Sequence, residues 1–208
     1  RNYQFDFHAY RNIATRRVIV LAGEGQQFRT DGQFDGVGGV KDPKAWTAHF
    51  SVTADAVLGN PITPDGCARS AGITLDLSQW KPILQQGAST LGVHIPAGGP
   101  LAHVQCGESF ALALSFFKKH FPEYYVTTFQ CESWLLDPQL ERYLPPETNL
   151  IRFLREFYLL PLPYGSNAGV ARFVYNKVDM DLSTASRRST LEKAIVDHVR
   201  QGGHWREI

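Results

Sequence analysis

The chain has 208 residues, of which 43% are hydrophobic and 12% aromatic, enough to build a core in one large or two small domains and to exclude disorder of the whole. Its 21 Lys and Arg residues against 20 Asp and Glu leave a formal net charge of +1, which argues against a nucleic acid as partner. The longest apolar stretches, such as residues 18–22 and 110–114, are far shorter than a membrane span, so we expect no membrane partner.

The first half of the chain is expected to form mostly short strands. Residues 17–28 predict a hairpin around Gly23-Glu24-Gly25, and the four glycines of residues 32–43 predict a flexible connection. Apolar and polar residues alternate from Trp46 to Val52, which is the period of a half-buried strand. Further along, the patterns predict a strand over 71–77, a helix over 79–86 that Ser78 caps, and a strand over 89–95.

In the second half, helices alternate with strands. After a break at residues 96–100, the patterns predict a helix over 104–120, a strand over 125–136, a helix over 148–158, a strand over 170–175 and a C-terminal helix capped by Ser189 or Thr190. An antiparallel meander that leads into such an alternation indicates an α+β, or mixed α/β, fold.

The start of the chain bears on its domain organisation. It begins at Arg1 rather than Met and shows no signal-peptide pattern, so we expect a piece of a longer protein. We assign N-terminal strands and a Gly-rich connection, in part the remnant of an upstream region, to residues 1–43. Residues 44–208 are then the main domain.

Cysteine and histidine spacing excludes several kinds of site. The three cysteines, Cys67, Cys106 and Cys131, form no CxxC pair, which argues against a structural zinc site and predicts reduced thiols in a cytoplasmic protein. The seven histidines show no HExxH or comparable spacing, so no metal is expected.

The junction between the predicted strand 89–95 and the helix that follows it is a candidate anion site. A helix N-terminus presents free backbone N–H groups and the positive end of the helix dipole. Gln105, Cys106, Gly107 and Ser109 lie at or near the first turns, where a pyrophosphate could be held. The alternative is that the glycines before this helix only interrupt the chain. The absence of a GxxxxGK[ST] motif argues against a nucleotide triphosphatase.

Two residues are candidate general bases. On a strand over 125–136, Glu132 and Trp134 share one face, with Cys131 and Ser133 on the other. A carboxylate in a cleft can serve as a general base, and the alternative for Glu132 is a structural hydrogen bond. His94, in the strand before the glycine break, titrates near neutrality, but a lone histidine can equally be structural. Cys131 is more typical of a small core residue than of a nucleophile.

Five segments together resemble one known family. They are HIPAGGPL, CGESFALALSFFKKHFP, FQCESWLLDPQLERYLP, TNLIRFLREFYLLP and RSTLEKAIVDHVRQGGHW. They resemble the C-terminal, GNAT-like domain of bacterial acyltransferase-domain proteins, a domain that usually follows a separate helical N-terminal domain. The resemblance covers roughly residues 46–205.

This resemblance implies a GNAT-like fold, with a central mixed, largely antiparallel sheet flanked by helices and two parallel strands that splay apart. In that superfamily the pantetheine arm of acetyl-CoA, or of another acyl-CoA, lies in the gap, and the pyrophosphate lies on the helix that follows the first strand. The resemblance makes residues 91–95, with Val93 and Ile95, the first splayed strand and residues 125–136 the second. It places Asn149 near the pantetheine.

The chain departs from the superfamily pattern at two points. The usual Q/R-x-x-G-x-G/A loop is absent, because Gln105 is followed by Cys106-Gly107-Glu108-Ser109. The tyrosine that often protonates the departing thiolate falls near Glu156 or Phe157, and Tyr158 would point about 100° away on an ideal helix.

Three functional hypotheses follow. The first is an acyl-CoA-dependent N-acyltransferase that transfers an acyl group to a small-molecule or peptide amine, with Glu132 or His94 as base. The second is a non-catalytic GNAT-like ligand-binding or protein-interaction module, which the two departures favour. The third is a thiol-dependent hydrolase that uses Cys131. No GxSxG elbow surrounds any serine, which weakens the hydrolase hypothesis.

Overall fold

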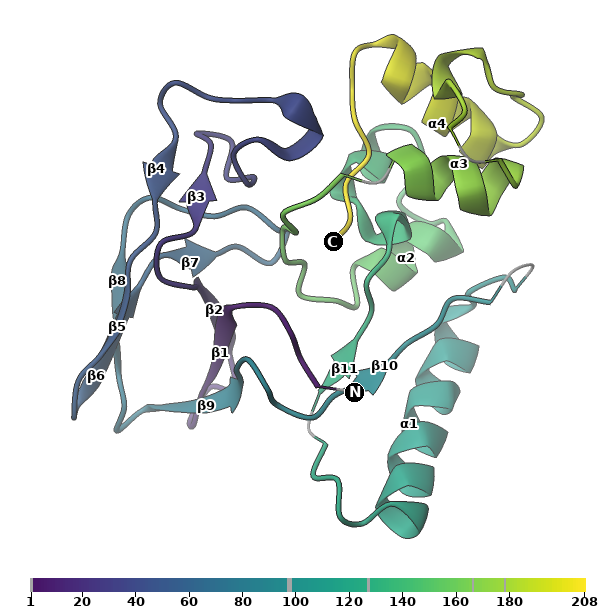
Figure 1. The fold of residues 1–208 in the computed structure, drawn as a ribbon. Helices are drawn as coiled ribbons and strands as arrows, with labels where there is room; N and C mark the ends of the chain where they lie inside the picture. Colours follow the sequence, from purple (N-terminus) through teal and green to yellow (C-terminus); the bar gives the residue numbers. More distant parts are fainter. Residues whose placement is uncertain (1, 97–98, 127, 166, 178) are drawn as a thin grey trace.

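The structure, a computed structural model, describes residues 2–96, 99–126, 128–165, 167–177 and 179–208. Strands dominate its first half and helices its second (Figure 1). The strands are β1 (Phe7–Asn12), β2 (Val18–Ala22), β3 (Gln27–Phe28), β4 (Trp46–Thr47), β5 (Phe50–Val52), β6 (Ala56–Gly59), β7 (Pro61–Ile62), β8 (Ile73–Asp76), β9 (Trp80–Leu84), β10 (Leu91–Gly92) and β11 (Phe129–Gln130).

The helices are α1 (His103–His120), α2 (Asn149–Leu154), α3 (Asn167–Tyr175) and α4 (Thr190–Arg200). Short 3-10 turns lie at Val37–Gly39, Trp134–Leu136, Pro138–Arg142 and Leu182–Thr184. The predicted α+β class is therefore confirmed.

The central sheet has the order β7-β2-β1-β9, with all neighbours antiparallel. Side chains alternate across it, as the period of two in a strand requires. In β2, Val20 and Ala22 belong to a core cluster on one face, whereas Leu21 packs on the other face with Val57 and Leu75 of the β5-β6-β8 sheet. Because both faces are covered, the middle of this sheet is buried.

The sheet joins strands from both sides of residue 43. β1 and β2 come from the N-terminal part, and they pair with β9 and β7, which come from the part after residue 44.

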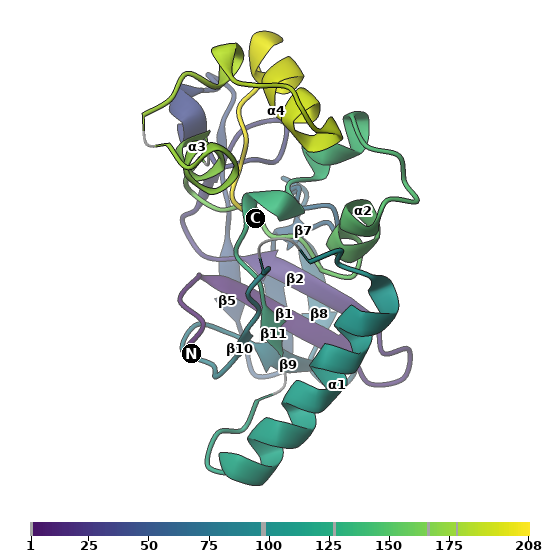
Figure 2. The same cartoon turned by 90° about the vertical axis from the view of Figure 1, so that its right-hand side faces the viewer.

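β10 and β11 form a separate parallel pair, with Leu91 opposite Phe129 and Gly92 opposite Gln130. The side chain of Thr90, which is buried, donates to Gln130 Oε1 at 3.1 Å beside the pair. Parallel strands need a long crossover connection, and here α1 supplies it, running past both strands in Figure 2. The predicted parallel pairing of the two segments is confirmed.

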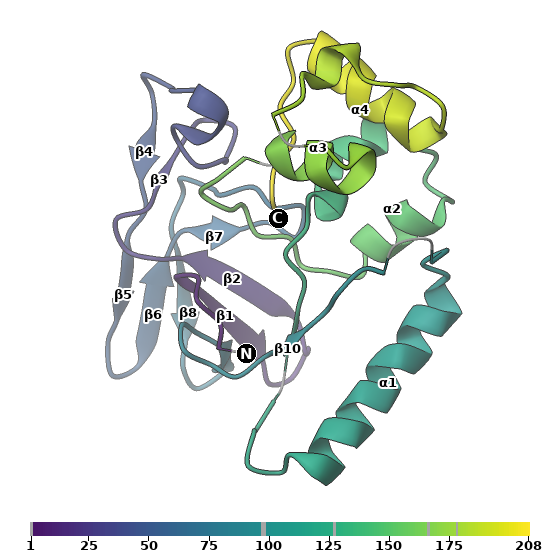
Figure 3. The ribbon, with the colours of Figure 1, turned by 45° about the vertical axis from the view of Figure 1, so that its right-hand side comes forward.

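The helical half has its own core around α4, which contains Trp134, Leu140, Ile151, Ile195 and Trp205. The C-terminal segment then returns toward the middle of the molecule (Figure 3), where Ile208 is buried. The backbone N–H of Ser133 donates to the carbonyl of Ile208 at 3.3 Å. The end of the chain thus lies beside the residues that follow β11.

Several predicted elements are corrected by the structure. The hairpin over 17–28 is wrong, because β2 pairs with β1 and β7 while β3 pairs with β4. The strand over 46–52 is divided between β4 and β5, which belong to different sheets. The helix over 79–86 is strand β9, and the strand over 170–175 is helix α3.

Other predicted elements exist with different lengths. Helix 104–120 is α1, and the C-terminal helix is α4, whose predicted cap Ser189 accepts a hydrogen bond from the Glu192 N–H at 3.1 Å. The helix over 148–158 ends as α2 at Leu154. The strand over 125–136 retains only β11, and residues 97–98 of the predicted break lie outside the described residues.

Candidate functional site

The candidate site begins where β10 and β11 end. The N–H of Leu91 donates to Thr128 O at 3.0 Å, and the N–H of Val93 donates to Gln130 O at 2.7 Å. Past these bonds, residues 93–96 and residues 131–135 both line one cavity. We call it the exit cavity; it measures about 610 Å³. The two parallel segments therefore open onto a space large enough for a ligand.

A second, smaller cavity of about 210 Å³ lies against α1, and we call it the helix cavity. Val93 and Ile95 line it together with Cys106, Ser109 and Phe110 of α1. The N-cap residue of α1, Ala102, provides no side-chain cap, and the first turn carries no acidic residue. The first N–H groups of α1 are thus available to an anion.

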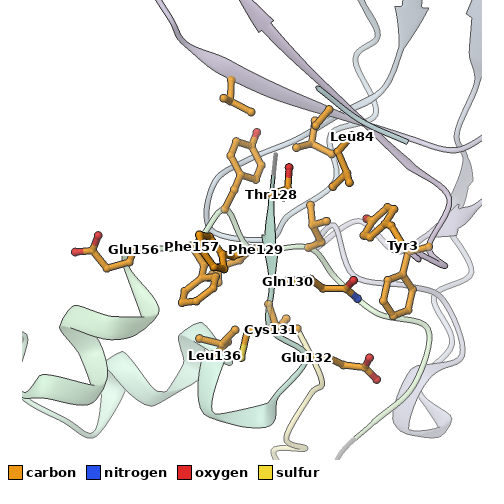
Figure 4. A pocket seen from close by; sticks show the side chains of 18 of the residues that line it. Tyr3, Leu84, Thr128, Phe129, Gln130, Cys131, Glu132, Leu136, Glu156 and Phe157 are labelled. Carbon is orange, nitrogen blue, oxygen red and sulfur yellow. The ribbon is translucent and has the colours of Figure 1, made fainter. Parts of the chain in front are cut away.

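A third cavity of about 440 Å³ lies between β11 and the central sheet, and we call it the apolar cavity (Figure 4). Its lining is mostly apolar. The lining includes Phe5, Val18, Val20, Ile83, Leu84, Phe110, Phe129, Leu136, Phe157, Leu159, Leu162 and Ile208. Cys131 and Glu132 line both this cavity and the exit cavity, and Phe110 lines both this cavity and the helix cavity. The apolar and exit cavities thus meet at the residues that follow β11, and the helix cavity adjoins the apolar cavity at Phe110.

Glu132 stands at the boundary between the apolar and exit cavities. Its Oε1 accepts a hydrogen bond from the hydroxyl of Tyr164 at 2.6 Å. Gly165, which follows Tyr164, forms an isolated β-bridge with Arg206. This bridge holds the loop that carries Tyr164 beside the C-terminal segment. Glu207 also lines the exit cavity. Two carboxylates, those of Glu132 and Glu207, therefore line the exit cavity, and we call this part of it the acidic mouth. Acidic side chains of this kind suit a cationic amine.

The predicted pattern of faces around Glu132 is wrong. The strand ends at Gln130, and Trp134 begins a 3-10 turn, where Ser133 caps it by accepting from the Leu135 N–H. Trp134 is buried while Glu132 is exposed. The exit cavity is lined by all of residues 131–134, rather than by alternate ones.

The structure brings most predicted site residues together. Val93, His94 and Ile95 line both the exit and helix cavities, and Gln105, Cys106 and Ser109 line the helix cavity. Gly107 is exposed on α1, and a Cβ atom there would meet nothing within 4 Å. Asn149 lies outside the linings of these three cavities, and its Nδ2 donates to Pro100 O at 2.8 Å, which ties α2 to the loop before α1.

The region after α2 also differs from expectation. Because α2 ends at Leu154, the angle that an ideal helix would give Tyr158 does not apply, and Glu156, Phe157 and Tyr158 all line the apolar cavity. Glu156 pairs with His103 at 3.1 Å, which fixes the start of α1 against this turn. The Tyr158 hydroxyl donates to the carbonyl of Ile62, and burial raises its pKa.

Sequence reasoning missed two tyrosines of the site. Tyr3 lies in the apolar cavity and Tyr164 at Glu132, far apart in the chain and outside any motif. Long-range contacts place them: Tyr3 pairs its backbone with Gly87 and Ala88, and the residue after Tyr164 forms the bridge to Arg206, so no local pattern indicates them.

Some features are absent from the part of the chain that the structure describes. There, no group of three or more His, Cys, Asp or Glu side chains is placed to hold a metal ion. None of the three cysteines forms a disulfide. Among the described residues, no helix has both the length and the apolar character that crossing a membrane requires.

Comparison with known proteins agrees with the geometry. The family model "GNAT-like C-terminal domain" matches residues 4–208. A solved acyltransferase in complex with decanoyl-CoA is 30% identical, with a TM-score of 0.53 over 76% of this chain and 44% of that chain. An acyltransferase in complex with decanoyl-CoA and teicoplanin is 37% identical, with a TM-score of 0.52 over 58% of this chain and 39% of that one.

A further solved structure, an acyltransferase mutant in complex with octanoyl-CoA, is 36% identical with a TM-score of 0.52, over 58% of this chain and 39% of that one. The chain therefore spans less than half the length of the solved structures it matches. Comparison with the curated proteins gives no match.

Proposed function

The chain belongs to the family of GNAT-like C-terminal domains, and from this premise we propose that it acts in an acyl-CoA-dependent N-acyltransferase. The observation that carries the proposal is the parallel pair β10–β11, which opens onto the exit cavity beside the uncapped N-terminus of α1. Acyltransferases of similar structure hold decanoyl-CoA and octanoyl-CoA.

Each part of an acyl-CoA has a matching surface at this site. The pantetheine arm would pass between the segments after β10 and β11, past Val93 and Ile95. The pyrophosphate would meet the N–H groups at the start of α1, close to Gln105, Cys106 and Ser109. The acyl chain would enter the apolar cavity at Cys131 and Glu132, which both cavities share. At about 440 Å³ this cavity favours a chain longer than acetyl.

The acceptor is proposed to be an amine. An amine attacks a thioester only when its nitrogen lone pair is free, so a base must take a proton from it. Glu132 at the acidic mouth, or His94 across the exit cavity, would accept that proton directly or through a water. The N–C bond then forms, the C–S bond breaks, and CoA leaves as a thiolate that takes up a proton. Holding both reactants in the gap supplies much of the rate.

Teicoplanin is bound in one of the similar acyltransferases, and 10C-teicoplanin is bound together with CoA in another, so teicoplanin is a useful acceptor to test first. An upstream helical domain and a cytoplasmic location stay predictions for the whole protein. The predicted sites at Gly107 and Asn149 also stay predictions.

A non-catalytic ligand-binding or interaction module is the second candidate. One observation favours it: none of the 18 residues of α1 is buried, and Leu112 is 70% exposed. An apolar surface of this kind often contacts another protein or domain.

Calorimetric titration of the chain with acetyl-CoA and decanoyl-CoA tests the proposal. We expect decanoyl-CoA to bind with micromolar affinity and more tightly than acetyl-CoA. Ser109→Trp should fill the helix cavity and weaken binding at least about tenfold. Ser115→Trp is the matched control, because Ser115 lies on the same helix, is exposed and is not among the residues that line the helix cavity. A folded chain that binds no acyl-CoA would favour the interaction module.

A further inference from the structure

We propose that the apolar cavity selects an acyl chain that carries an oxygen atom, with the hydroxyl of Tyr3 hydrogen-bonded to that oxygen. This inference rests on the proposed function, since it assumes that the acyl chain of an acyl-CoA enters the cavity. It goes further by naming the substrate class and the residue that selects it.

Tyr3 is held firmly in the cavity wall. Its N–H donates to Ala88 O at 2.8 Å, and its carbonyl accepts from the Gly87 N–H at 2.8 Å. Its ring packs edge-on against Phe5, with the ring centroids 5.7 Å apart. The residue is 3% exposed. Both backbone groups are thus paired and the ring is packed, so Tyr3 is a fixed part of the wall.

The Tyr3 hydroxyl is a buried polar group without a hydrogen-bond partner among the described residues. Burial raises the pKa of Tyr3, with Asp6 adding to the effect, so the hydroxyl stays protonated and can donate. A buried polar group that lacks a partner destabilises the protein, because its hydrogen bonds to water are lost and nothing replaces them. In native proteins such a group usually has a partner, and Tyr3 is one of the residues that line the cavity in which the proposed ligand would lie.

Tyr158 shows the contrast within the same cavity. It also lines the wall, but its hydroxyl donates to the carbonyl of Ile62 and is satisfied by the protein itself. Figure 4 shows Tyr3 on the side of the cavity opposite Glu156 and Phe157, among apolar side chains. A plain alkyl chain in this cavity would leave the Tyr3 hydroxyl unpaired, whereas a chain with a hydroxyl or keto oxygen would pair it.

The oxygen is assigned to the acyl chain because of where the cavity opens. Glu132 and Cys131 are the residues that it shares with the exit cavity, where the thioester is proposed to lie. The acyl chain leads from the thioester into the apolar cavity, while the acceptor amine belongs at the acidic mouth. A water bound to Tyr3 is the competing explanation.

Binding of decanoyl-CoA is to be compared calorimetrically with that of three hydroxydecanoyl-CoA isomers, bearing the hydroxyl at the β-carbon, at mid-chain and at the chain end. Three positions are needed because the path of the chain sets which carbon passes Tyr3. We expect at least one isomer to bind the wild-type chain about tenfold more tightly than decanoyl-CoA, the effect of one satisfied buried hydroxyl.

Tyr3→Phe and Tyr158→Phe form the matched pair of variants. Tyr3→Phe should abolish the preference for the hydroxylated chain and leave the ligand-free protein at least as stable as wild type, because no hydrogen bond is lost. Tyr158→Phe should keep the preference while lowering stability, because it loses the bond to Ile62. Thermal unfolding of both variants supplies a readout that is independent of binding.

The outcomes separate this inference from the proposed function. Acyl-CoAs that bind with no preference for any hydroxylated isomer would overturn the inference alone and support a water at Tyr3. A preference that survives in Tyr3→Phe would do the same. A wild-type chain that binds none of the acyl-CoAs would overturn the proposed function, and the inference with it.

Discussion

Helices α1 and α4 differ in how they are attached to the molecule. α4 has 11 residues, of which Ala194, Ile195, Val196 and His198 are buried. α1 has 18 residues and buries none. The first half of α1 makes its main contacts to the rest of the molecule. His103 pairs with Glu156, and the ring of Phe110 packs near that of Phe129, with the ring centroids 4.8 Å apart.

The sequences explain this difference. The apolar residues of α4 gather on one face, so that a single core can cover them. In α1, Phe110 faces the cavities, but Leu112 lies about 160° away from it on an ideal helix, and Phe116 is 51% exposed. The comparison indicates a division of labour. α4 stabilises the fold, whereas α1 carries the proposed ligand-binding N–H groups and exposes apolar side chains.

The largest effect on stability is expected where α4 ends. A Cβ atom at Gly203 would lie 2.3 Å from the ring of His198, and that ring packs against Trp205 with centroids 4.4 Å apart. Gly203→Ala should therefore lower the free energy of unfolding by about 3 kcal/mol, measured by urea denaturation. In a His198→Ala background the methyl group has room, so the same substitution should have much less effect. Equal losses in both backgrounds would show that the ring is not the obstacle.

In the candidate site, by contrast, substitution of Glu132 should lower turnover without changing stability. Glu132→Gln removes the proposed base and should lower kcat about 100-fold with decanoyl-CoA and an amine acceptor, while urea denaturation stays within about 0.5 kcal/mol of wild type. Tyr164→Phe should lower kcat less, about tenfold, because it leaves the carboxylate in place and removes the hydrogen bond that orients it.

Tyr175→Phe is the control for Tyr164→Phe. Its hydroxyl donates to Ser186 O at 3.2 Å, and Tyr175 is not among the residues that line the three cavities. Full turnover in Glu132→Gln would leave His94 as the base. A large loss of stability in Glu132→Gln would instead show that Glu132 makes a structural hydrogen bond.

The sequence predicts long, regular elements better than short ones. The predictions of α1 and of the capped helix α4 are correct, because in each of them apolar residues recur at helical spacing over several turns. The helix expected over 79–86 is β9 because β1 supplies backbone partners, and Pro82 is tolerated there since β9 is an edge strand. Tertiary pairing thus overrides a local cap signal at Ser78.

The strand expected over 170–175 failed for a different reason. Val, Phe and Tyr favour strands in general, yet Val170 and Val174 are four residues apart and both pack into the core around α4. That spacing is helical, and Phe173 between them is 75% exposed. A short window contains both periods, and only the position of the core distinguishes them.

The candidate site was predictable where it lies on consecutive residues. Residues 93–95 and the start of α1 line the cavities as expected from their order in the chain. Tyr3, Tyr164 and Ile208 come from the two ends and from a loop, and long-range pairing alone places them there. The resemblance identified the family, but it could not supply these contacts.

The pH dependence of stability should report on the α4 side. Burial lowers the pKa of His198, and Arg142 and Arg206 lower it further, against the His204 carbonyl and Asp137, which raise it. The unfolded chain then binds the proton more readily than the folded one. Stability should be unaffected by this group above about pH 6.5 and should fall as the pH drops below that value. His198→Asn should flatten this part of the urea-denaturation profile; an unchanged slope would assign it to other groups, such as His8, whose pKa burial also lowers.

The smallest effect, and a stabilising one, is expected in α1. Gly107 lies inside the helix, and a methyl group added there would have no atom within 4 Å, so Gly107→Ala should raise the free energy of unfolding by about 0.5–1 kcal/mol through helix propensity alone. Because Gly107 is not among the residues that line the cavities, affinity for decanoyl-CoA should stay unchanged. A stabilised variant with weakened binding would show that the phosphates approach the backbone at Gly107, as the sequence predicted. A destabilised variant would mean that this face of α1 is covered, contrary to the contrast with α4.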